Sequence, residues 1–299
     1  MNKIDVSIII PTKNAESDIE KCLNGIFQQK TGLKYEVVVI DSGSTDNTLQ
    51  IVEKFPVQLI PINAEEFGHG KTRNLGASLA QGKYLVYLTQ DACPADEGWL
   101  ENLITNFTAE RVAGVYSRWI PKEDCNPLEL RRILELFGPF KEIRALTGIN
   151  IDDYSKYIKR FIHFSNVSSA IARDIWQKIP FNDYAVFAED QEWARRVLEA
   201  GYTIIYEPKS KVYHSHNDSL KTCFKRGFDG AGFLKQTKNL SMNPLYNFSV
   251  VLFLIMEDSA FIMRNRFGIV KKIRWIAYSV ILNITRQVSV SLGACRNKL

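Results

Sequence analysis

Carboxylates and histidines stand beside several short apolar segments of the chain, and their types and spacing suit metal binding and proton transfer. Asp91 follows the apolar segment "YLVYLT", and Asp190 lies in the first turn of the helical pattern "EDQEWARRVLEA". His214 and His216 stand two residues apart in "YHSHND". Carboxylates and imidazoles are ligands for divalent cations, and an ionised carboxylate can also accept a proton. The structural alternatives are a strand end, a helix cap or a loop hydrogen bond.

The elements that must position these residues alternate along the first third of the chain. Strands rich in β-branched residues are predicted over residues 6–11, 36–41, 57–62 and 84–91. Helices are predicted from Ile19 to a C-cap at Gly32, within residues 42–55, and over residues 70–82. This alternation predicts a mostly parallel sheet flanked by helices, with ligands at the carboxyl ends of the strands. Asp41 and Asp91 would both lie at that edge.

The second half of the chain is less regular. Residues 121–164 contain the helical spacing "PLELRRILELF", followed by "GPFKEIRALTGINIDDYSKY", which has no clear period and is expected to form a wall of the site. A helix is predicted from Asp190 to Glu199 with Gly201 as its stop, and a strand from Thr203 to Tyr206.

Composition limits the classes of ligand and compartment. The net charge of +5 suits a polyanionic ligand or an anionic membrane, and without a long basic block it argues against nucleic acid. Five scattered cysteines without Cys-x-x-Cys spacing predict reduced thiols in a cytosolic protein. The first apolar run, after Asp5, is too short for a signal peptide, so the protein is expected to stay inside the cell.

The C-terminal region is apolar and basic. The longest apolar stretch, residues 247–263, is interrupted by Glu257 and Asp258, which weakens a transmembrane interpretation. The following segment, "RNRFGIVKKIRWIAYSVILNITRQ", combines Arg and Lys with aromatic and Ile residues. Such a helix can lie on a membrane surface or pack as an ordinary helix on the domain, and both alternatives stay open.

A sheet of this type first suggests a dinucleotide-binding oxidoreductase, but "PTKNAES" follows the first strand in place of the glycine fingerprint. The chain instead resembles the family 2 nucleotide-sugar glycosyltransferases, which have the GT-A fold. The resemblance rests on "SIIIPTKNAESDIEKCLNGI", "VVVIDSGSTDNTL", "GKTRNLGASLAQGKYLVYLTQDA" and "FAEDQEWARRVLEAGY", in that order over roughly the first 220 residues. It implies a GT-A domain over residues 1–219 and a helical C-terminal region over residues 220–299.

The resemblance also implies a nucleotide site at the ends of the first two strands. Base or ribose contacts fall on Pro11, Thr12 and Asn14, and recognition of uracil or thymine falls on Asp41. Position 43 of the following loop, Gly43, is also assigned to the nucleotide-sugar site. A strand-end turn or helix cap is the alternative for Asp41, and capping explains Asp46 well.

In "FGHGKTRN", two glycines permit close backbone approach, an arrangement suited to a diphosphate. By resemblance Arg73 and Asn74 lie beside the nucleotide-sugar, whereas Lys71 is equally well explained as a solvated surface residue.

The family usually places Asp-x-Asp after the next strand, and here the triplet is Gln90, Asp91 and Ala92. One carboxylate can still help to hold Mg²⁺ or Mn²⁺ with phosphate oxygens and water. His214 and His216 would alternate along an extended segment, so one of them, preferably His214, is expected to face the cleft.

By resemblance Asp190 is the catalytic base, which removes the proton of the acceptor hydroxyl in a single inverting displacement. With an ordinary pKa it would be ionised at pH 7. The alternative is an acidic pair, Glu189 and Asp190, that favours the helix dipole.

"FGHGKTRN" and "VYHSHNDSL" resemble bacterial enzymes that transfer L-rhamnose from dTDP-L-rhamnose to surface polysaccharides. That likeness implies a glycan acceptor on a lipid carrier at the cytoplasmic membrane face, and Ser168, Ser169 and Ala170 on the acceptor side. The basic residues from Leu220 to Leu299 are then expected to drive peripheral association with that membrane. The alternatives are another donor, such as UDP-glucose, UDP-galactose or UDP-GlcNAc, and a non-catalytic nucleotide-sugar-binding protein.

Overall fold

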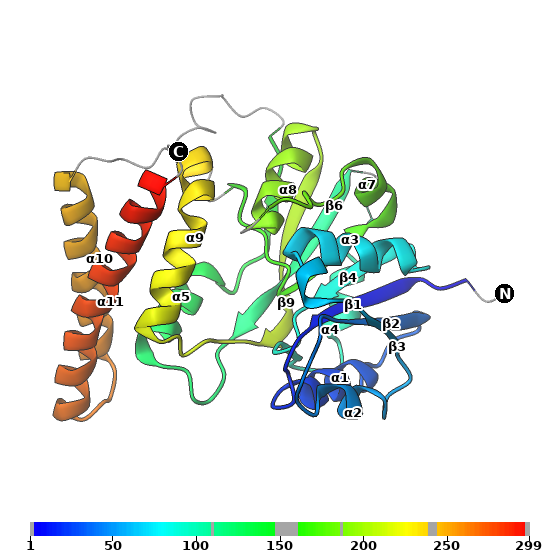
Figure 1. The fold of residues 1–299 in the computed structure, drawn as a ribbon, viewed down its shortest axis with the longest axis horizontal. Helices are drawn as coiled ribbons and strands as arrows, with labels where there is room; N and C mark the ends of the chain where they lie inside the picture. Colours follow the sequence, from blue (N-terminus) through cyan, green and yellow to red (C-terminus); the bar gives the residue numbers. More distant parts are fainter. Residues whose placement is uncertain (1–2, 109–110, 147–160, 186–187, 239–243, 297–299) are drawn as a thin grey trace. The chain divides into compact units, whose positions relative to one another are not determined.

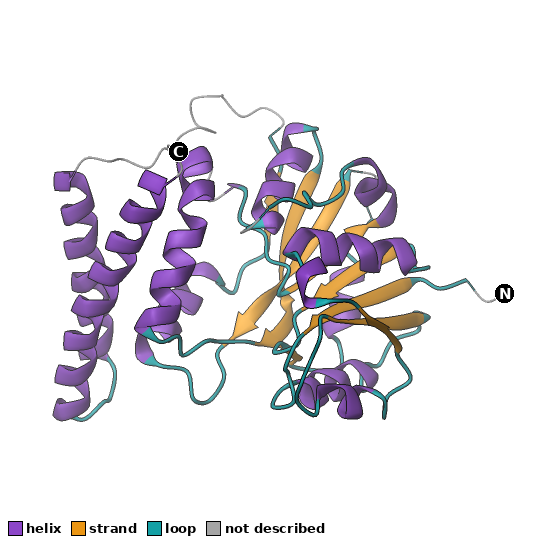
Figure 2. Ribbon diagram, in the orientation of Figure 1, coloured by secondary structure: helices purple, strands orange, loops and turns teal. Residues whose placement is uncertain are grey.

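The computed structural model describes residues 3–108, 111–146, 161–185, 188–238 and 244–296. The chain divides into two compact units. The first comprises Met1–Ile120 and Phe137–His214, and the second comprises Pro121–Leu136 and Ser215–Leu299. Figure 1 traces the elements along the chain, and Figure 2 shows a sheet with helices on both faces in the first unit and helices in the second.

The first unit is built on a mixed sheet. Its strands are β1 (Val6–Thr12), β2 (Tyr35–Asp41), β3 (Gln58–Pro61), β4 (Tyr84–Leu88), β5 (Cys93–Pro94), β6 (Val112–Ile120), β7 (Glu142–Arg144), β8 (Ser168–Ala172) and β9 (Thr203–Tyr213). Their order is β3-β2-β1-β4-β8-β6-β9-β5, and β7 pairs with β9. Strands β1 to β4 are parallel, so their carboxyl ends share one edge of the sheet. Because β8 runs antiparallel to β4, the residues just before Ser168 reach the same edge.

Helices cover the sheet because successive residues of its strands face opposite sides. The helices of this unit are α1 (Ile19–Phe27), α2 (Thr48–Val52), the 3₁₀ helix η1 (Ala64–Glu66), α3 (His69–Leu79), α4 (Trp99–Ile104), α7 (Arg173–Lys178) and α8 (Glu189–Glu199). Ile8 and Ile10 of β1 belong to the core that includes α1, α2 and α4. Ile9 faces α3, where a Cβ on Gly76 would lie 2.4 Å from its side chain. Glycine therefore allows α3 to pack closely on the sheet.

Two predictions are wrong, one about the end of the first helix and one about the burial of the strand at the edge of the sheet. α1 ends at Phe27 with Gln28 as its C-cap, so Gly32 does not cap it. β3 lies at the edge of the sheet, and its residues are half-buried or exposed rather than buried, because only one neighbouring strand covers it.

Two boundaries near the site also differ. β4 ends at Leu88, and Asp91 lies in the following turn, which a hydrogen bond from Ala92 N–H to Thr89 O closes at 3.0 Å. β9 continues beyond Tyr206 to Tyr213. The predicted stop of α8 is confirmed, because Gly201 follows the helix with a φ of 81°, a conformation that glycine adopts without strain.

The second unit is helical. It contains α5 (Pro127–Leu136), α9 (Leu220–Lys238), α10 (Pro244–Arg264) and α11 (Ile269–Arg296). Leu128 of α5 packs with Ile262 of α10 and Leu282 of α11. α5 comes from the middle of the sequence, so this unit is not one continuous C-terminal segment. Within the described parts of the chain, every helix is too short or too polar to span a bilayer.

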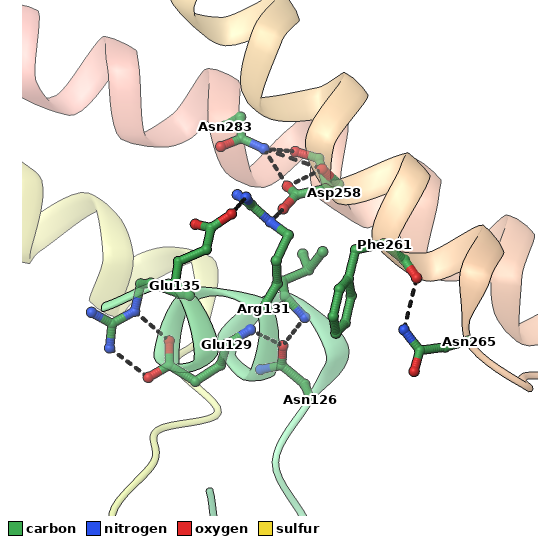
Figure 3. A network of polar contacts seen from close by, with 11 residues as sticks. Asn126, Glu129, Arg131, Glu135, Asp258, Phe261, Asn265 and Asn283 are labelled. Atoms are coloured by element: carbon green, nitrogen blue, oxygen red, sulfur yellow. Dashed lines mark hydrogen bonds and ion pairs between the residues drawn. The ribbon is translucent and has the colours of Figure 1, made fainter. Parts of the chain in front are cut away.

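A buried carboxylate joins three of these helices (Figure 3). Asp258 interrupts the apolar face of α10 and is 3% exposed. Its carboxylate accepts hydrogen bonds from Arg131 Nε of α5 at 2.6 Å, and from Ser279 Oγ (2.5 Å) and Asn283 Nδ2 (2.8 Å) of α11. The charge that weakens a transmembrane interpretation of the sequence thus has a structural role as a partner for neighbouring helices.

Candidate active site

Hydrogen bonds tie together the loops after β1 and β2. Ser42 donates to Thr12 O from its N–H (2.9 Å) and from its hydroxyl (3.1 Å). Asn14 has a φ of 47°, accepts from Thr45 N–H at 2.8 Å and donates its N–H to Ser44 Oγ at 2.8 Å. The structure therefore brings together Thr12, Asn14 and the loop after Asp41. Their contact with a nucleotide stays a prediction.

Asp41 is buried, and its carboxylate forms part of its own turn. It accepts hydrogen bonds from Gly43 N–H (3.0 Å), Ser44 N–H (2.9 Å) and the Ser44 hydroxyl. Gly43 has the φ of 81° that this turn uses. A carboxylate has about four lone-pair directions, so one more donor, such as the N–H of a base, can be accommodated. Pro11, opposite Ile40 in the sheet, is half-buried beside it.

Two further polar side chains organise this edge of the sheet. Asp46 Oδ1 accepts from Thr48 N–H at 3.0 Å and Oδ2 from Glu16 N–H at 3.2 Å, which supports the capping interpretation. Gln90 accepts from Lys13 N–H at 2.7 Å and donates to Lys13 O at 3.1 Å. Gln90, which stands where the family usually has an acid, thus fixes the β1 loop to the β4 loop. No sequence signal indicated this role.

Asp91, His214 and His216 lie together. Their ligand atoms all fall within 4.8 Å of one another, and His214 Nδ1 is 3.5 Å from Asp91 Oδ1. The pairing of β5 with β9 places Cys93 opposite Tyr213, so the residues before β5 meet those after β9. The expectation that only one histidine faces the site is wrong, because β9 ends at Tyr213 and strict alternation ends with it.

The donor set of this cluster fits a divalent cation. One carboxylate and two imidazoles supply three protein ligands and leave positions for phosphate oxygens and water. His214 is buried, and its ring meets Trp119 edge-on with centroids 4.6 Å apart, which fixes its orientation. Imidazole ligands favour Mn²⁺ over Mg²⁺, which prefers oxygen.

Asp190 lies at the N-terminus of α8, beside the same edge of the sheet. Its Oδ2 accepts from Asn166 N–H at 3.1 Å, and the adjoining Val167 O accepts from Thr89 N–H, two residues before Asp91. Burial, and then the adjacent charge of Glu189, raise the pKa of Asp190 to about 7. The expectation of an ordinary pKa is therefore wrong: this carboxylate is poised to exchange a proton near neutral pH.

A buried ion pair supports the start of α8. Arg73 Nη1 lies 2.8 Å from Glu189 Oε1, and both side chains are less than a tenth exposed. Glu189 also accepts from Asn166 Nδ2 at 3.3 Å, and Arg73 donates to His69 O at 3.1 Å. Arg73, which the resemblance places beside the nucleotide-sugar, is thus the ion-pair partner of Glu189, the residue next to Asp190. Asn166 contacts both acids and had no sequence signal beyond its position before a strand.

The segment "FGHGKTRN" joins α3 to residues 181–183. A Cβ on Gly70 would lie 2.3 Å from Asn182 O, so the close backbone approach at this glycine is to the protein itself. Asn74 Nδ2 donates to Phe181 O (2.8 Å) and Asp183 Oδ1 (2.7 Å), and its Oδ1 accepts from Trp176 Nε1 (2.8 Å). These bonds use the amide within the fold. Lys71 is exposed, as its surface interpretation predicts.

The acceptor-side prediction for Ser168 and Ala170 is wrong, because both are fully buried in the sheet. Ser168 Oγ accepts from Trp99 Nε1 at 2.8 Å. Ser169 is equally buried, so the prediction is wrong for it too. Its hydroxyl donates to Asn166 Oδ1 at 2.8 Å and so supports the residue that holds Asp190.

A shallow depression of about 430 Å³ lies along α8 and includes neither Asp91 nor Asp190. It is lined by Asn74, Pro180, Phe181, Asn182, Asp183, Tyr184, Glu192 and Arg196. The loop predicted to form a wall of the site spans residues 138–157, and its part from residue 147 onward lies outside the described residues.

Comparisons with known proteins identify the family of the chain. The family described as Glycosyl transferase family 2 matches residues 7–165. The chain is 32% identical over 229 residues to the O-antigen chain rhamnosyltransferase WbaN of Salmonella anatum, covering 76% of this chain and 71% of that protein. It is 31% identical over 231 residues to the O-antigen chain rhamnosyltransferase RfbN of Salmonella typhimurium LT2, covering 76% and 72%.

Solved structures show the same fold at low sequence identity. The mannosyltransferase PcManGT of Pyrobaculum calidifontis, in complex with GDP-Man and Mn²⁺, superposes with a TM-score of 0.63 at 18% identity, over 100% of this chain and 88% of that one. TarS of S. aureus, in complex with UDP-GlcNAc, gives a TM-score of 0.57 at 18% identity, over 99% and 92%. With the family match and the rhamnosyltransferase relatives, these results show that the chain belongs to glycosyltransferase family 2 and is a glycosyltransferase of the GT-A fold.

Proposed function

We propose that the protein is an inverting, metal-dependent rhamnosyltransferase that moves L-rhamnose from dTDP-L-rhamnose to a hydroxyl of a growing surface glycan on a lipid carrier. The observation that carries the chemistry is Asp190, whose pKa is raised to about 7 at the sheet edge where Asp91 and His214 also lie. Two relatives that match 76% of the chain at 32% and 31% identity, both named O-antigen chain rhamnosyltransferases, support the donor and the acceptor class.

In the proposed reaction the acceptor hydroxyl oxygen attacks the anomeric carbon from the face opposite the diphosphate. Asp190 accepts the hydroxyl proton, and the bond from the anomeric carbon to the diphosphate oxygen breaks, so dTDP leaves with the electron pair. A single displacement inverts the anomeric centre. A divalent cation held by Asp91, His214 and His216 would supply positive charge to neutralise the departing diphosphate.

Residues of the β1 and β2 loops would hold the nucleotide. Asp41 would accept from the base N3–H while its own turn keeps the carboxylate in place, and Pro11, Thr12 and Asn14 would line the base or ribose. The lipid-linked acceptor would place the enzyme at the cytoplasmic membrane face.

A panel of thermal-shift measurements tests the donor. Ligands that bind the folded state raise the melting temperature by mass action, so dTDP-rhamnose with Mn²⁺ should stabilise the protein more than UDP-glucose, UDP-galactose, UDP-GlcNAc or GDP-mannose. Asp91→Ala should remove the metal-dependent part of the shift. A larger shift with another donor would overturn rhamnose, and an unchanged metal effect in Asp91→Ala would overturn the metal site.

Asp190→Asn tests catalysis separately from binding. We expect transfer to fall by about 100-fold to 10,000-fold, because the variant lacks the base, while donor binding persists. Unchanged turnover would contradict the assignment. If dTDP binds but the wild-type protein transfers and hydrolyses no donor, it is a non-catalytic nucleotide-sugar-binding protein.

A further inference from the structure

Exposed apolar side chains concentrate on α10 and α11. Of the twenty large apolar side chains that the described residues expose, twelve belong to these two helices. The most densely exposed group surrounds the turn that joins them, residues 263–274, here called the α10–α11 tip. Met263 is 54% exposed, Ile269 67%, Val270 76% and Ile273 63%. Leaving several large apolar groups in water at one place marks a contact surface for an apolar partner.

The same tip is strongly cationic. The last 41 residues contain eight Lys and Arg and no Asp or Glu, whereas the first 258 contain 30 basic and 33 acidic residues, a net charge of −3. Arg264, Arg266, Lys271 and Arg274 are exposed on the tip, interleaved with the apolar side chains. Among the described residues, these four cations make no ion pair with a carboxylate. Lys272 differs, because its ammonium group donates to Met263 O at 2.8 Å and so caps the end of α10.

We propose that the α10–α11 tip docks on an anionic lipid bilayer, with Ile269, Val270 and Ile273 at the boundary of headgroups and acyl chains and Arg264, Arg266, Lys271 and Arg274 against lipid phosphates. This deepens the proposed function, on whose lipid-linked acceptor it rests, by naming the surface that makes the contact. A basic helix segment with exposed apolar side chains binds membranes by apolar burial together with attraction to anionic lipid.

The positive charge of the tip favours an anionic lipid surface, rather than a second copy of the chain, as its binding partner. A two-fold contact through the tip would bring the same cations of two molecules together, and like charges across an interface oppose association. An anionic bilayer surface instead offers phosphates to the cations and an apolar layer to the side chains between them. One occupant therefore satisfies both features of the tip.

Co-sedimentation of the full chain with vesicles tests the proposal. We expect strong binding to vesicles of phosphatidylcholine mixed with phosphatidylglycerol, weakened by salt, and weak binding to phosphatidylcholine alone. Neutralising three tip cations in the variant R266Q/K271Q/R274Q should lower the partition coefficient by about 100-fold, because each cation near an anionic leaflet contributes about fivefold. I269S/V270S/I273S should also lose binding, and since these side chains are exposed its melting temperature should stay near that of the wild type.

A matched control removes three exposed lysines of the first unit, in the variant K54Q/K178Q/K209Q. It has the same loss of charge and should bind vesicles within about threefold of the wild type if the tip is the contact. Equal losses in the two charge variants, equal binding to both vesicle types, or wild-type binding by either tip variant would overturn the proposal. So would a dimer in sedimentation equilibrium that I269S/V270S/I273S converts to a monomer.

Transfer to a water-soluble acceptor separates this proposal from the proposed function. The tip variants should retain that transfer, because the tip contains none of the residues assigned to the site. If no donor is transferred although the wild-type chain binds anionic vesicles through the tip, the proposed function fails and the docking surface stands. If transfer occurs but vesicles are not bound, the docking surface fails.

Discussion

Asp190 owes its raised pKa to burial first and to Glu189 second, while the positive charge of Arg73 acts in the opposite direction. The sequence predicted the acid itself, because Asp190 stands at a helix start within a matched motif. It could not predict the pairing of Arg73 with Glu189, which depends on how α3 and α8 pack. For the same reason the resemblance places Arg73 beside the nucleotide-sugar, whereas in the structure its guanidinium lies against the carboxylate of Glu189. The sequence gives the type of each side chain, but the partner of a buried charge depends on how distant elements pack in the tertiary structure.

The pH dependence of transfer should reveal this environment. If Asp190 is the base, as proposed, it acts when it is deprotonated, so kcat/KM should fall as the pH drops below about 7. Glu189→Gln removes the negative neighbour, which lowers the pKa of Asp190 and moves this acidic limb to lower pH. Glu192→Gln, three residues along the same helix and paired with Arg196, should leave the limb in place. A limb that does not move in Glu189→Gln would show that Glu189 does not tune the base.

Among the elements, the sequence located the parallel strands and the helices between them, because their apolar periodicity is strong. The sequence did not predict which residues the pairing of distant strands brings together. The register of β5 against β9 brings Asp91 to both histidines, and β5 is a strand of two residues that no periodicity can reveal. Gln90 likewise acts through a bond to the backbone of Lys13 in another loop. The candidate metal ligands were thus foreseeable as residue types, and the number that come together depends on strand register.

Gly25 of α1 should influence metal binding without being a ligand. A Cβ at Gly25 would lie 2.9 Å from Pro94 Cδ and 3.2 Å from Cys93 Sγ, so Gly25→Val should push β5 away from its register with β9. We expect Mn²⁺ affinity, measured by calorimetry with dTDP present, to weaken roughly tenfold, as for changes that disturb ligand support. Gly32→Val, where a Cβ meets nothing within 4 Å, is the matched control. Equal affinities in the two variants would exclude β5 as the determinant.

At the scale of the whole molecule, two separate segments of the sequence, Pro121–Leu136 and Ser215–Leu299, form the second unit. The proposed transferase domain of residues 1–219 includes α5, yet α5 packs with the C-terminal helices through Leu128 and Arg131. Sequence periodicity identified α5 as a helix, but it does not report which of two units a helix joins. Sequence patterns also predicted that the C-terminal region is helical. They did not predict the buried partners of Asp258, which lie on two other helices.

Removal of residues 220–299 should therefore affect more than membrane contact. The shortened protein, residues 1–219, leaves Leu128 without Ile262 and Leu282 and leaves Arg131 without Asp258. We expect a lower melting temperature and concentration-dependent association, both reduced by replacing Leu128 with Gln, because an exposed apolar helix face favours association. Light scattering and thermal unfolding would check this. A fully stable, monomeric shortened protein would show that α5 does not need the C-terminal helices.

The joint between α3 and residues 181–183 has a consequence for variation among relatives. Gly70 has no room for a side chain against Asn182 O, and Asn74 shares one hydrogen bond with Asp183. Selection at these positions would then act on the fit of two chain segments, whichever sugar is transferred. We expect positions 70, 74 and 183 to change together across the family, independently of donor preference. Differences at these positions would then reflect the evolutionary relationship of two enzymes rather than the sugars that they transfer.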